Sequence, residues 1–584
     1  MNTSRNTPKE VTIRIGGAAG QGMSLIGGLL GRSFVRRGLW IFTHQNVMSR
    51  IRGGHNFTQI RISGKPVRCP SSQVDILVCL DKNTLELYQD EDFGLFIFDP
   101  GKWDDSPPER DNFLHLPMEQ IAQDEGGSNR MANTVAAGAL LSLLDLETDI
   151  LEKRLEEIFS QKGAQVVEAN QKCARAGYSY IQDNYQGKIL GGFPEKESGK
   201  KRMLLTGSEA MALGGLAGGL RFYSAYPMSP ATAIMEYLAG KQDEYNITVE
   251  QAEDEIAAVN MAIGSFFAGT RAMTGTSGGG MALMAEGISL AGMTETPLVI
   301  IDCQRPAPAT GLPTRTEQAD LLFAVNAGHG EFPRVILAPA DAEESFHLVS
   351  KALYLAEKYH VQVFVLGDQY LNDSSWTVEN ISLNNIPETG QGLISDQELN
   401  NLSSYEYRRY RLTDSGVTPR LIPGTPGQVL YADSDEHTQE GHITESAAVR
   451  KNMVDKRRRK KQSLLEEISP PKILPDLNQD NYLVSWGSNF HIVEEARKIL
   501  NQNGNSFGHI HFSEVYPVKK DALPQNFSEK FLISIENNAT AQLSQLLKTE
   551  AGISIQNHVL KYDGRPFTPQ ELVQKIKDTG GQND

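Results

Sequence analysis

The chain has 584 residues, of which 40% are hydrophobic and 22% charged, and its formal net charge is −16. This length exceeds what one hydrophobic core holds, and roughly 150 to 200 residues per domain predicts three or four domains. The negative charge argues against general nucleic-acid binding. No apolar run could span a bilayer, and the first ten residues lack the apolar stretch of a secretory signal, so we expect no membrane contact and a cytoplasmic location.

Residues 1–190 alternate apolar runs with glycine turns and helical patterns, which predicts an α/β domain with a mostly parallel sheet. Between Val11 and Val74 this segment contains no Asp or Glu but nine Lys and Arg residues. In so acidic a chain, this local excess of positive charge predicts an anionic ligand. Contact with an acidic partner or with another part of the chain would explain it too.

A glycine turn joins the first expected strand to the first expected helix in "VTIRIGGAAGQGMSLIGG". Gly17, Gly20 and Gly22 would let the backbone approach a phosphate group at a helix N-terminus, and Arg52 lies in a second glycine turn, "IRGGHN". The spacing is neither G-x-G-x-x-G nor a nucleoside triphosphate loop, so a different polyphosphate is favoured. The alternative is that the glycines serve only tight strand-to-helix packing.

Three further segments follow a polar, glycine-containing linker at residues 191–202. Strand-like runs from "RFYSAYP" to "VQVFVLGD" predict a second α/β domain over residues 203–375. Residues 376–477 lack this alternation of strand-like and helical runs, which predicts irregular loops closed by a charged helix near 445–468. A third α/β domain is expected over residues 478–584. The predicted fold class is therefore α/β, with three domains and an irregular insertion.

Three acids precede an apolar helical run in "TVEQAEDEIAAVNMAIGSFFAG". Acids in a first helical turn favour the helix dipole, which would explain Glu253, Asp254 and Glu255 without any chemistry. Glu255 alone abuts the apolar run, which we expect to be buried on all sides. A carboxyl group so poorly solvated could exchange a proton with a ligand.

Two other stretches suggest ligand contacts in the second domain. Ser229 lies between two prolines in "YPMSPAT", after an apolar strand, where open α/β sheets bind ligands. Arg315 lies in "TGLPTRTEQADL", a loop suited to capture of a carboxylate. Either stretch could instead be a simple turn.

Two clusters in the insertion have simpler explanations. The basic run "DKRRRKK" (455–461) is expected to be a solvated or subunit-facing surface. His437 and His442 lie in the acidic stretch "DSDEHTQEGH", for which a flexible loop is a better explanation than a metal site. No metal site is expected on this chain, and its four cysteines contain no C-x-x-C pair for a cluster.

Nine motifs in order resemble the 2-oxoacid:ferredoxin oxidoreductases, over nearly the whole chain: "GAAGQG", "IRGG", "YPMSPAT", "EDEIAAVNMAIG", "GTSGGG", "TGLPTRTEQADL", "VSWGS", "ENNATAQL" and "YDGRPFT". Their arrangement is similar to an alpha subunit with the gamma domain fused at its front, as in the 2-oxoglutarate enzymes. The domains implied are a gamma-type domain, a thiamine diphosphate pyrimidine-binding domain and a transketolase C-terminal-like domain.

The resemblance implies oxidative decarboxylation of a 2-oxoacid with coenzyme A to an acyl-CoA and CO2, with electrons passed to ferredoxin. It makes Glu255 the glutamate that hydrogen-bonds the aminopyrimidine of thiamine diphosphate, and it gives Ser229 and Arg315 substrate contacts. Ser229 stands where relatives usually carry Thr. The gamma-like segment, with Gly17, Gly20, Gly22 and Arg52, would meet coenzyme A.

Magnesium, diphosphate and iron–sulfur binding are expected on a separate beta subunit, because no G-D-G followed by Asn is present. The chain should then be active only with that subunit, as an alpha–beta heterodimer or a dimer of heterodimers. Pyruvate, a branched-chain or an aryl 2-oxoacid are alternative substrates. A non-catalytic scaffold subunit and a transketolase-type enzyme are the alternatives from other functional classes. "GTSGGG" departs from the usual "TSGPG" at Gly279.

Overall fold

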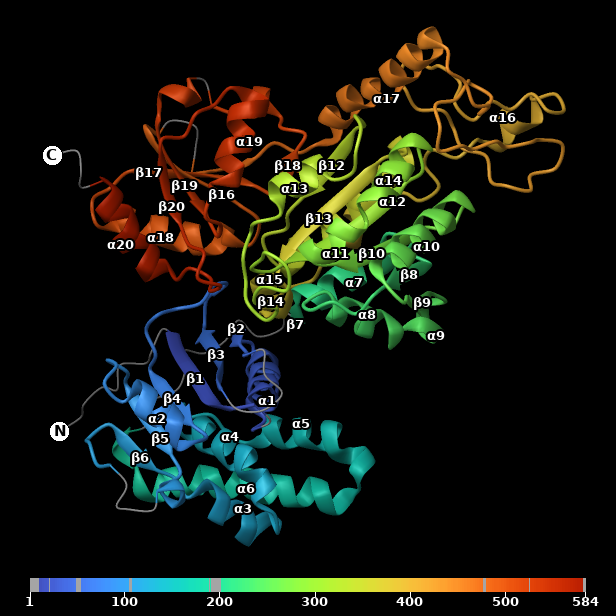
Figure 1. Ribbon diagram of the computed structural model, residues 1–584. Coiled ribbons are helices and arrows are strands. Elements are labelled where there is room, and N and C mark those ends of the chain that lie inside the picture. Colours follow the sequence, from blue (N-terminus) through green and yellow to red (C-terminus); the bar gives the residue numbers. More distant parts are fainter. Residues whose placement is uncertain are drawn as a thin grey trace. The chain divides into compact units, whose positions relative to one another are not determined.

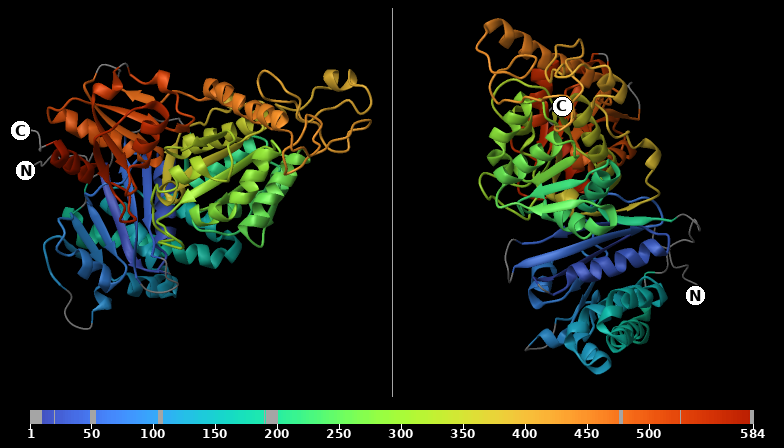
Figure 2. Two further views of the ribbon diagram at one scale, coloured as in Figure 1. Left: turned by 45° about the horizontal axis from the view of Figure 1, so that its top comes forward. Right: turned by 90° about the vertical axis from the view of Figure 1, so that its right-hand side faces the viewer.

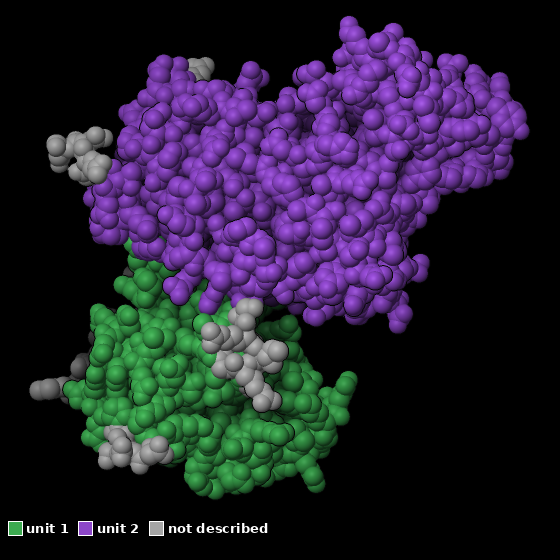
Figure 3. All heavy atoms as spheres, viewed as in Figure 1, with its two compact units in different colours: residues 1–205, 374–381, 568–570 green, residues 206–373, 382–567, 571–584 purple. Residues whose placement is uncertain are grey.

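A computed structural model describes most of the chain: residues 10–19, 21–48, 54–103, 108–188, 190, 201–475, 479–524 and 526–580. It divides into two compact units, each treated separately below (Figure 3). Unit 1 contains residues 1–205 together with residues 374–381 and 568–570. Unit 2 contains the remainder.

Unit 1 is built on one eight-stranded sheet of order β6-β5-β4-β1-β3-β2-β14-β7 (Figure 1). Its strands are β1 (Glu10–Ala18), β2 (Trp40–Asn46), β3 (His55–Ser63), β4 (Ile76–Cys79), β5 (Leu95–Phe98), β6 (Phe113–His115), β7 (Met203–Thr206) and β14 (Ser375–Val378). Its helices are α1 (Met23–Arg36), α2 (Lys82–Tyr88), α3 (Met118–Gly126), α4 (Ala132–Leu143), α5 (Asp149–Phe159) and α6 (Ala164–Asn184).

Only part of this sheet is parallel, contrary to the expectation from the sequence. β1, β4, β5 and β6 pair in parallel, whereas β3 pairs antiparallel with both β1 and β2, and β14 pairs antiparallel with β2. The connection from Asn46 to His55 is too short for a helical crossover, so β2 and β3 must be antiparallel. β14 comes from far along the chain, and its Thr377 Oγ1 bonds the backbone of Ile41 in β2.

Unit 2 contains a seven-stranded sheet of order β18-β12-β13-β11-β10-β8-β9, parallel except for β18. Its strands are β8 (Phe222–Ala225), β9 (Thr248–Gln251), β10 (Ala272–Thr276), β11 (Leu298–Gln304), β12 (Arg334–Leu337), β13 (Gln362–Asp368) and β18 (Glu514–Tyr516). The associated helices are α7 (Gly207–Ala217), α8 (Thr232–Ala239), α9 (Gln242–Tyr245), α10 (Glu255–Phe267), α11 (Gly278–Leu283), α12 (Ala285–Met293), α13 (Leu321–Asn326), α14 (Ala342–Tyr359) and α15 (Gln369–Asp373).

A five-stranded sheet of order β15-β17-β16-β19-β20 completes unit 2. Its strands are β15 (Lys472–Leu474), β16 (Asn481–Trp486), β17 (Phe507–Phe512), β19 (Phe531–Glu536) and β20 (Asn557–Leu560), with helices α18 (Phe490–Gln502), α19 (Gln542–Ala551) and α20 (Pro569–Gly580). The α/β fold class with three sheets is thus confirmed. Because β18 directly follows β17 and pairs with β12, it joins the two sheets of unit 2.

The insertion of unit 2 is irregular, as expected, between α16 (Asp396–Asn400) and α17 (Ala447–Glu467). It extends beyond the helices that cover the seven-stranded sheet (Figures 1 and 2). The Ser446 side chain caps the start of α17 by accepting a hydrogen bond from the Val449 backbone. None of the described helices is long and apolar enough to cross a membrane.

Candidate active site

The candidate site lies at the carboxyl ends of four adjacent strands, β9, β8, β10 and β11. The chain runs from β8 outward to β9 and then returns to β10 on the other side of β8. This reversal of strand order is a topological switch point, where open α/β sheets bind their ligands. Ser229 follows β8, Glu255 follows β9, Gly278–Gly280 follows β10, and Arg305 directly follows β11.

The three acids at the start of α10 have different environments. The Asp254 side chain caps the helix by accepting a hydrogen bond of 2.7 Å from the Ala257 N–H, and Glu253 is exposed. Glu255 is only 3% exposed, and its Oε1 atom has no hydrogen-bond partner in the described part of the chain. A buried carboxyl oxygen without a partner is costly, so this atom is available for a ligand.

The "GTSGGG" segment closes tightly over Glu255. A Cβ atom on Gly280 would lie 2.6 Å from Glu255 Oε1 and would overlap Thr276 Oγ1, so only glycine fits there. A Cβ atom on Gly279 would have the Ala309 carbonyl oxygen as its nearest neighbour, at 3.8 Å. The departure from the usual motif at Gly279 therefore leaves open space, whereas Gly280 is required by the packing.

Arg305 joins this group, although no sequence motif singled it out. Its Nη1 atom donates a 2.7 Å hydrogen bond to the carbonyl oxygen of Ser229, and the residue as a whole is buried. Burial lowers the pKa of Arg305, and the charges of Asp302, Asp320 and Glu255 oppose that shift. Arg305 therefore places a positive charge beside the exposed Ser229, and this charge interacts with that of Glu255.

Arg315 lies in a different neighbourhood, against the turn of the "YDGRPFT" motif. The Thr316 N–H donates to the Gly564 carbonyl oxygen at 3.2 Å. Burial and the nearby Arg565 lower the pKa of Arg315, while Asp563 raises it. The structure thus gives two candidate cations, one beside Ser229 and one beside the third sheet's final turn.

The separate motifs of the third sheet meet at Gln318. Its backbone N–H donates to Asn537 at 2.7 Å, and its side chain donates to the Trp486 carbonyl oxygen at 3.1 Å. Its Oε1 atom accepts a bond of 2.8 Å from Asn489. These bonds fix the "TGLPTRTEQADL" loop to "VSWGS" and "ENNATAQL", which explains how motifs far apart in sequence serve one site.

Exposed apolar side chains on the segments of the site, called the apolar rim below, correct the expectation that α10 is buried on all sides. Ile256 is 47% exposed and Met261 is 40% exposed, and both lie on α10. Three other large apolar side chains are also exposed on segments of the site: Tyr226, Leu283 and Leu312. Such an apolar face is typical of a surface that another chain covers.

The glycine loop of unit 1 is occupied by the chain's own side chains. Gln21 Oε1 accepts a hydrogen bond of 2.7 Å from the Ala18 N–H, and a Cβ atom on Gly17 would overlap that oxygen. Gly22 has a left-handed backbone with φ 76°, and a Cβ atom there would overlap Asn133. These contacts favour the packing explanation for both glycines. Gly20 and Arg52 lie outside the described residues.

Several cations of the acid-free segment are paired within unit 1. Arg36 Nη2 lies 2.8 Å from Glu157, Arg37 pairs with Asp149, and Arg61 Nη2 lies 2.7 Å from Glu10. The guanidinium of Arg14 lies 4.6 Å from the centre of the Phe57 ring. Among the described residues, acids outside the segment therefore pair with three of its nine cations, which weakens the case for an anionic ligand.

The basic run of α17 is not simply a solvated surface, and this expectation was wrong for three of its residues. Lys456 and Lys460 are almost fully buried, and both bind the carboxylate of Glu295, at 2.7 and 2.6 Å. Arg457 is also buried and pairs with Glu436 at 2.8 Å. The run anchors α17 to the seven-stranded domain.

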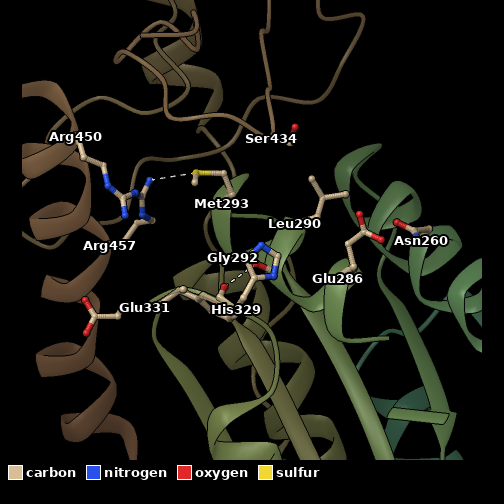
Figure 4. Close-up of a pocket in the computed structure, with 14 residues that line it drawn as sticks. Asn260, Glu286, Leu290, Gly292, Met293, His329, Glu331, Ser434, Arg450 and Arg457 are labelled. Carbon is tan, nitrogen blue, oxygen red and sulfur yellow. Dashed lines mark hydrogen bonds between the residues drawn. The ribbon is translucent and has the colours of Figure 1, made fainter. Parts of the chain in front are cut away.

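A cavity of about 720 Å³ lies beside α17 in unit 2 (Figure 4). Arg450 and Arg457 enter it from α17, whereas Asn260 and Glu286 enter it from α10 and α12. Its lining includes neither Glu255 nor Ser229. His437 is buried and His442 exposed, and among the described residues no group of three or more His, Cys, Asp or Glu is placed to hold a metal ion.

The α/β fold with a buried acid at its switch point agrees with a thiamine diphosphate-binding domain, which one of two matching family models indicates. "Pyruvate flavodoxin/ferredoxin oxidoreductase, thiamine diP-bdg" matches residues 214–456, and "Pyruvate ferredoxin/flavodoxin oxidoreductase" matches residues 12–180. The chain belongs to the 2-oxoacid:ferredoxin oxidoreductase family and corresponds to its alpha subunit.

Individual relatives can be aligned with nearly the whole chain. A 2-oxoacid:ferredoxin oxidoreductase subunit alpha of Sulfolobus sp is 32% identical, over 97% of this chain and 96% of the relative. The 2-oxoglutarate oxidoreductase subunit KorA of Mycobacterium tuberculosis is 27% identical, over 98% and 92%. The solved 2-oxoglutarate:ferredoxin oxidoreductase of Magnetococcus marinus, with 2-oxoglutarate, coenzyme A and succinyl-CoA bound, is 30% identical, with TM-score 0.90 over 98% of this chain and 100% of that chain.

Proposed function

We propose that this chain is the fused gamma–alpha subunit of an enzyme that converts 2-oxoglutarate and coenzyme A to an acyl-CoA and CO2 and reduces ferredoxin through a beta subunit. The Magnetococcus marinus structure, with its bound 2-oxoglutarate and succinyl-CoA, and the KorA relative support this substrate. The observation that carries the proposal is the buried, unpartnered Glu255 Oε1 at the switch point.

The residues at the site fit the pyrimidine half of thiamine diphosphate. Bound there, the cofactor supplies the electron sink needed when CO2 leaves a 2-oxoacid. Glu255 would hold the aminopyrimidine and exchange a proton with it through Oε1, an atom that has no other partner within the described residues. Gly280 leaves the space above this oxygen free of any side chain.

Substrate contacts fall to Ser229 and to one of the two cations. The Ser229 hydroxyl is exposed at the end of β8 and can donate to the substrate. We propose that Arg305, fixed to the Ser229 carbonyl oxygen, holds the carboxylate next to the reacting ketone. Arg315 then remains for the second carboxylate of 2-oxoglutarate, and a monocarboxylate such as pyruvate would not need it.

The remaining roles belong to other surfaces and another chain. The exposed apolar rim supports a beta subunit that covers the site and excludes water, and to that subunit we assign magnesium and the iron–sulfur cluster. Gly17, Gly20, Gly22 and Arg52 remain our proposed coenzyme A contacts, although the packing at Gly17 and Gly22 supplies a competing reason for those two. An alpha–beta heterodimer or its dimer is the assembly that we propose.

Two pairs of variants in the reconstituted complex test the proposal. Glu255→Gln should reduce thiamine-dependent ferredoxin reduction by about 10² to 10⁴-fold, because the proton-exchanging group is lost. Glu253→Gln, at an exposed acid two residues earlier, is the matched control. Equal activity of the two variants would contradict the catalytic role and would favour a scaffold subunit.

The second pair addresses the substrate. Arg305→Met should raise KM for 2-oxoglutarate and pyruvate alike, whereas Arg315→Met should raise it for 2-oxoglutarate alone. A panel of pyruvate, branched-chain and aryl 2-oxoacids with the wild-type complex would identify the preferred substrate directly. A preference for pyruvate over 2-oxoglutarate would refute our substrate assignment.

A further inference from the structure

Two buried histidines of the five-stranded sheet have no role in the function proposed above. His509 and His511 lie on β17, and both are 0% exposed. Ser485, on the neighbouring strand β16, lies between them: its Oγ atom is 2.8 Å from His509 Nε2 and 2.9 Å from His511 Nδ1. The ring of Phe490, at the start of α18, stacks on that of His509, with 5.5 Å between the ring centres. One buried hydroxyl group therefore bridges two imidazole rings.

The single hydroxyl proton limits how these three groups can bond. Ser485 can donate to one ring nitrogen, so the other nitrogen bonds Ser485 Oγ only if it carries a proton itself. His509 Nδ1 lies 3.6 Å from the Glu494 carboxylate, which favours a proton on that nitrogen. Neutral His509 then accepts from the Ser485 hydroxyl through Nε2, and His511 donates to Ser485 Oγ through Nδ1. The bridge is thus complete when both rings are neutral.

An added proton has no favourable position in this bridge. His511 Nε2 is buried without a hydrogen-bond partner among the described residues, so a proton there would create a buried cation with nothing to bind. A proton on His509 Nε2 would turn the acceptor of the Ser485 hydroxyl into a second donor. Either proton therefore costs free energy in the folded state.

The acids that face the two rings already have partners in the described part of the chain. Glu494 accepts from the Arg497 guanidinium at both of its oxygens, at 2.7 and 2.9 Å. Asp341 lies 2.7 Å from His491 Nε2 through one oxygen, and through the other it caps α14. The remaining titratable or charged neighbours of the rings are Arg497 and His491 on α18 and Lys472 on β15.

These surroundings keep both rings neutral near pH 7. Burial lowers the pKa of His509, and Glu494 only partly opposes the shift. Burial also holds the pKa of His511 well below its ordinary value, and Asp341 only partly opposes that shift. The pKa of histidine in an unfolded chain is about 6.5. Because both folded values are depressed, the two neutral rings stabilise the fold fully above about pH 6.5, and this stabilisation is lost as the pH falls below it.

The bridge lies next to residues that hold a loop of the candidate site. Trp486 directly follows Ser485, and its carbonyl oxygen accepts a bond of 3.1 Å from the Gln318 side chain. Asn489, three residues further on, donates to the same side chain at 2.8 Å. Gln318 belongs to the "TGLPTRTEQADL" loop, which also carries Arg315. A displacement of the end of β16 would therefore disturb this loop.

We propose that Ser485, His509 and His511 form an acid-sensitive bridge that holds the end of β16, and through it the Gln318 loop, only while both rings are neutral. The inference rests on the proposed function only in naming a 2-oxoacid as the substrate whose binding changes. Each pH unit below about 6.5 should raise the opening equilibrium of β16 and β17 by up to about tenfold for each histidine. The three residues are positioning residues that act through Gln318.

Hydrogen exchange of the assembled complex, measured by mass spectrometry without substrate or thiamine diphosphate, tests the bridge. After correction for intrinsic exchange rates, β16, β17 and residues 312–320 of the wild type should exchange about tenfold faster or more at pH 5.5 than at pH 7.5. The double variant His509→Gln/His511→Asn should abolish this difference, because Gln can place an acceptor at the position of Nε2 and Asn a donor at that of Nδ1. His558→Asn, at an exposed histidine of β20 that bonds Ser534 at 2.7 Å, is the matched control and should leave the difference unchanged.

Kinetics tests the effect on the site. KM for the 2-oxoacid should rise as the pH falls from 7.5 to 5.5 in the wild type, and a return to pH 7.5 should restore it. The double variant should show a smaller rise. Ser485→Ala, which lacks the bridging hydroxyl, should have a raised KM at both pH values.

Two results would overturn the inference. One is equal exchange of wild-type β16 and β17 at the two pH values, a measurement that needs no variant. The other is the same acid-induced increase in the double variant as in the wild type. A wild-type complex in which β16 and β17 open at pH 5.5, but which does not reduce ferredoxin at pH 7.5, would instead count against the proposed function.

Discussion

The buried contact between α17 and Glu295 makes a sharp prediction about the insertion. Lys456 Nζ lies 2.7 Å and Lys460 Nζ 2.6 Å from the Glu295 carboxylate, and all three side chains are at most 1% exposed. Burial alone would raise the pKa of Glu295, but the two ammonium groups hold it well below its usual range. Burial lowers the pKa of both lysines, that of Lys460 to about 7, and Glu295→Gln would leave these buried amino groups facing a neutral amide.

Removal of one partner from a buried ion pair costs about 3 to 5 kcal/mol, because the remaining charge is uncompensated. At 1.4 kcal/mol for each factor of ten, this corresponds to a rise of about 10² to 10³-fold or more in the opening equilibrium of α17. Limited trypsin digestion reports such opening through the rate of cleavage in residues 382–446. Glu466→Gln, at an exposed acid on the same helix, should leave the rate unchanged.

Replacement of Glu295, Lys456 and Lys460 together by Met should restore most of the protection, because apolar side chains of similar size can replace a buried ion cluster. The reasoning would be refuted if Glu295→Gln and Glu466→Gln were cleaved at the same rate. It would also be refuted if the triple variant were cleaved faster than Glu295→Gln.

Three further substitutions test the packing of the chain. Gly280→Ala should weaken thiamine diphosphate binding to the complex at least tenfold, measured by titration calorimetry, because its Cβ would displace Glu255, whereas Gly279→Ala has space and should bind normally. Gly22→Ala should destabilise unit 1 by about 1 to 2 kcal/mol in urea unfolding, because its φ is positive, and Gly28→Ala on the open face of α1 should not. Trp376→Ala should lower the free energy of unfolding by about 3 to 5 kcal/mol in the same measurement. The centre of its ring lies 5.5 Å from that of Phe42, and its Nε1 atom donates to the carbonyl oxygen of Arg68. A loss of less than about 1 kcal/mol would contradict the role of β14 in holding unit 1 together.

Much of the fold could be predicted because local patterns determine it. The strands β11 and β13 begin with or contain the apolar runs "LVII" and "VFVL", and the predicted charged helix is α17. The partners of β14 could not be predicted, because Thr377 pairs with Ile41, 336 residues away. The same limit applies to Lys456 and Lys460. Their spacing places them on one helix face, but Glu295 is remote in sequence.

The sequence predicted a candidate site where a carboxyl group abuts an apolar helix, and the structure shows that this carboxyl group, Glu255, is buried. Arg305 was missed, although it follows the strand-like run "PLVIIDCQ" directly, and the carboxyl-end rule that selected Ser229 could have found it. The burial of Asp302 was missed because a single acid within an apolar strand gives no signal of its surroundings.

The most direct test of the central claim is a structure of the assembled complex with thiamine diphosphate bound. We predict that Glu255 Oε1 will lie within hydrogen-bond distance, about 2.6 to 3.2 Å, of a pyrimidine nitrogen, with the apolar rim covered by the partner subunit. A thiamine ring bound elsewhere, with Glu255 still unpartnered or facing bulk water, would contradict the account.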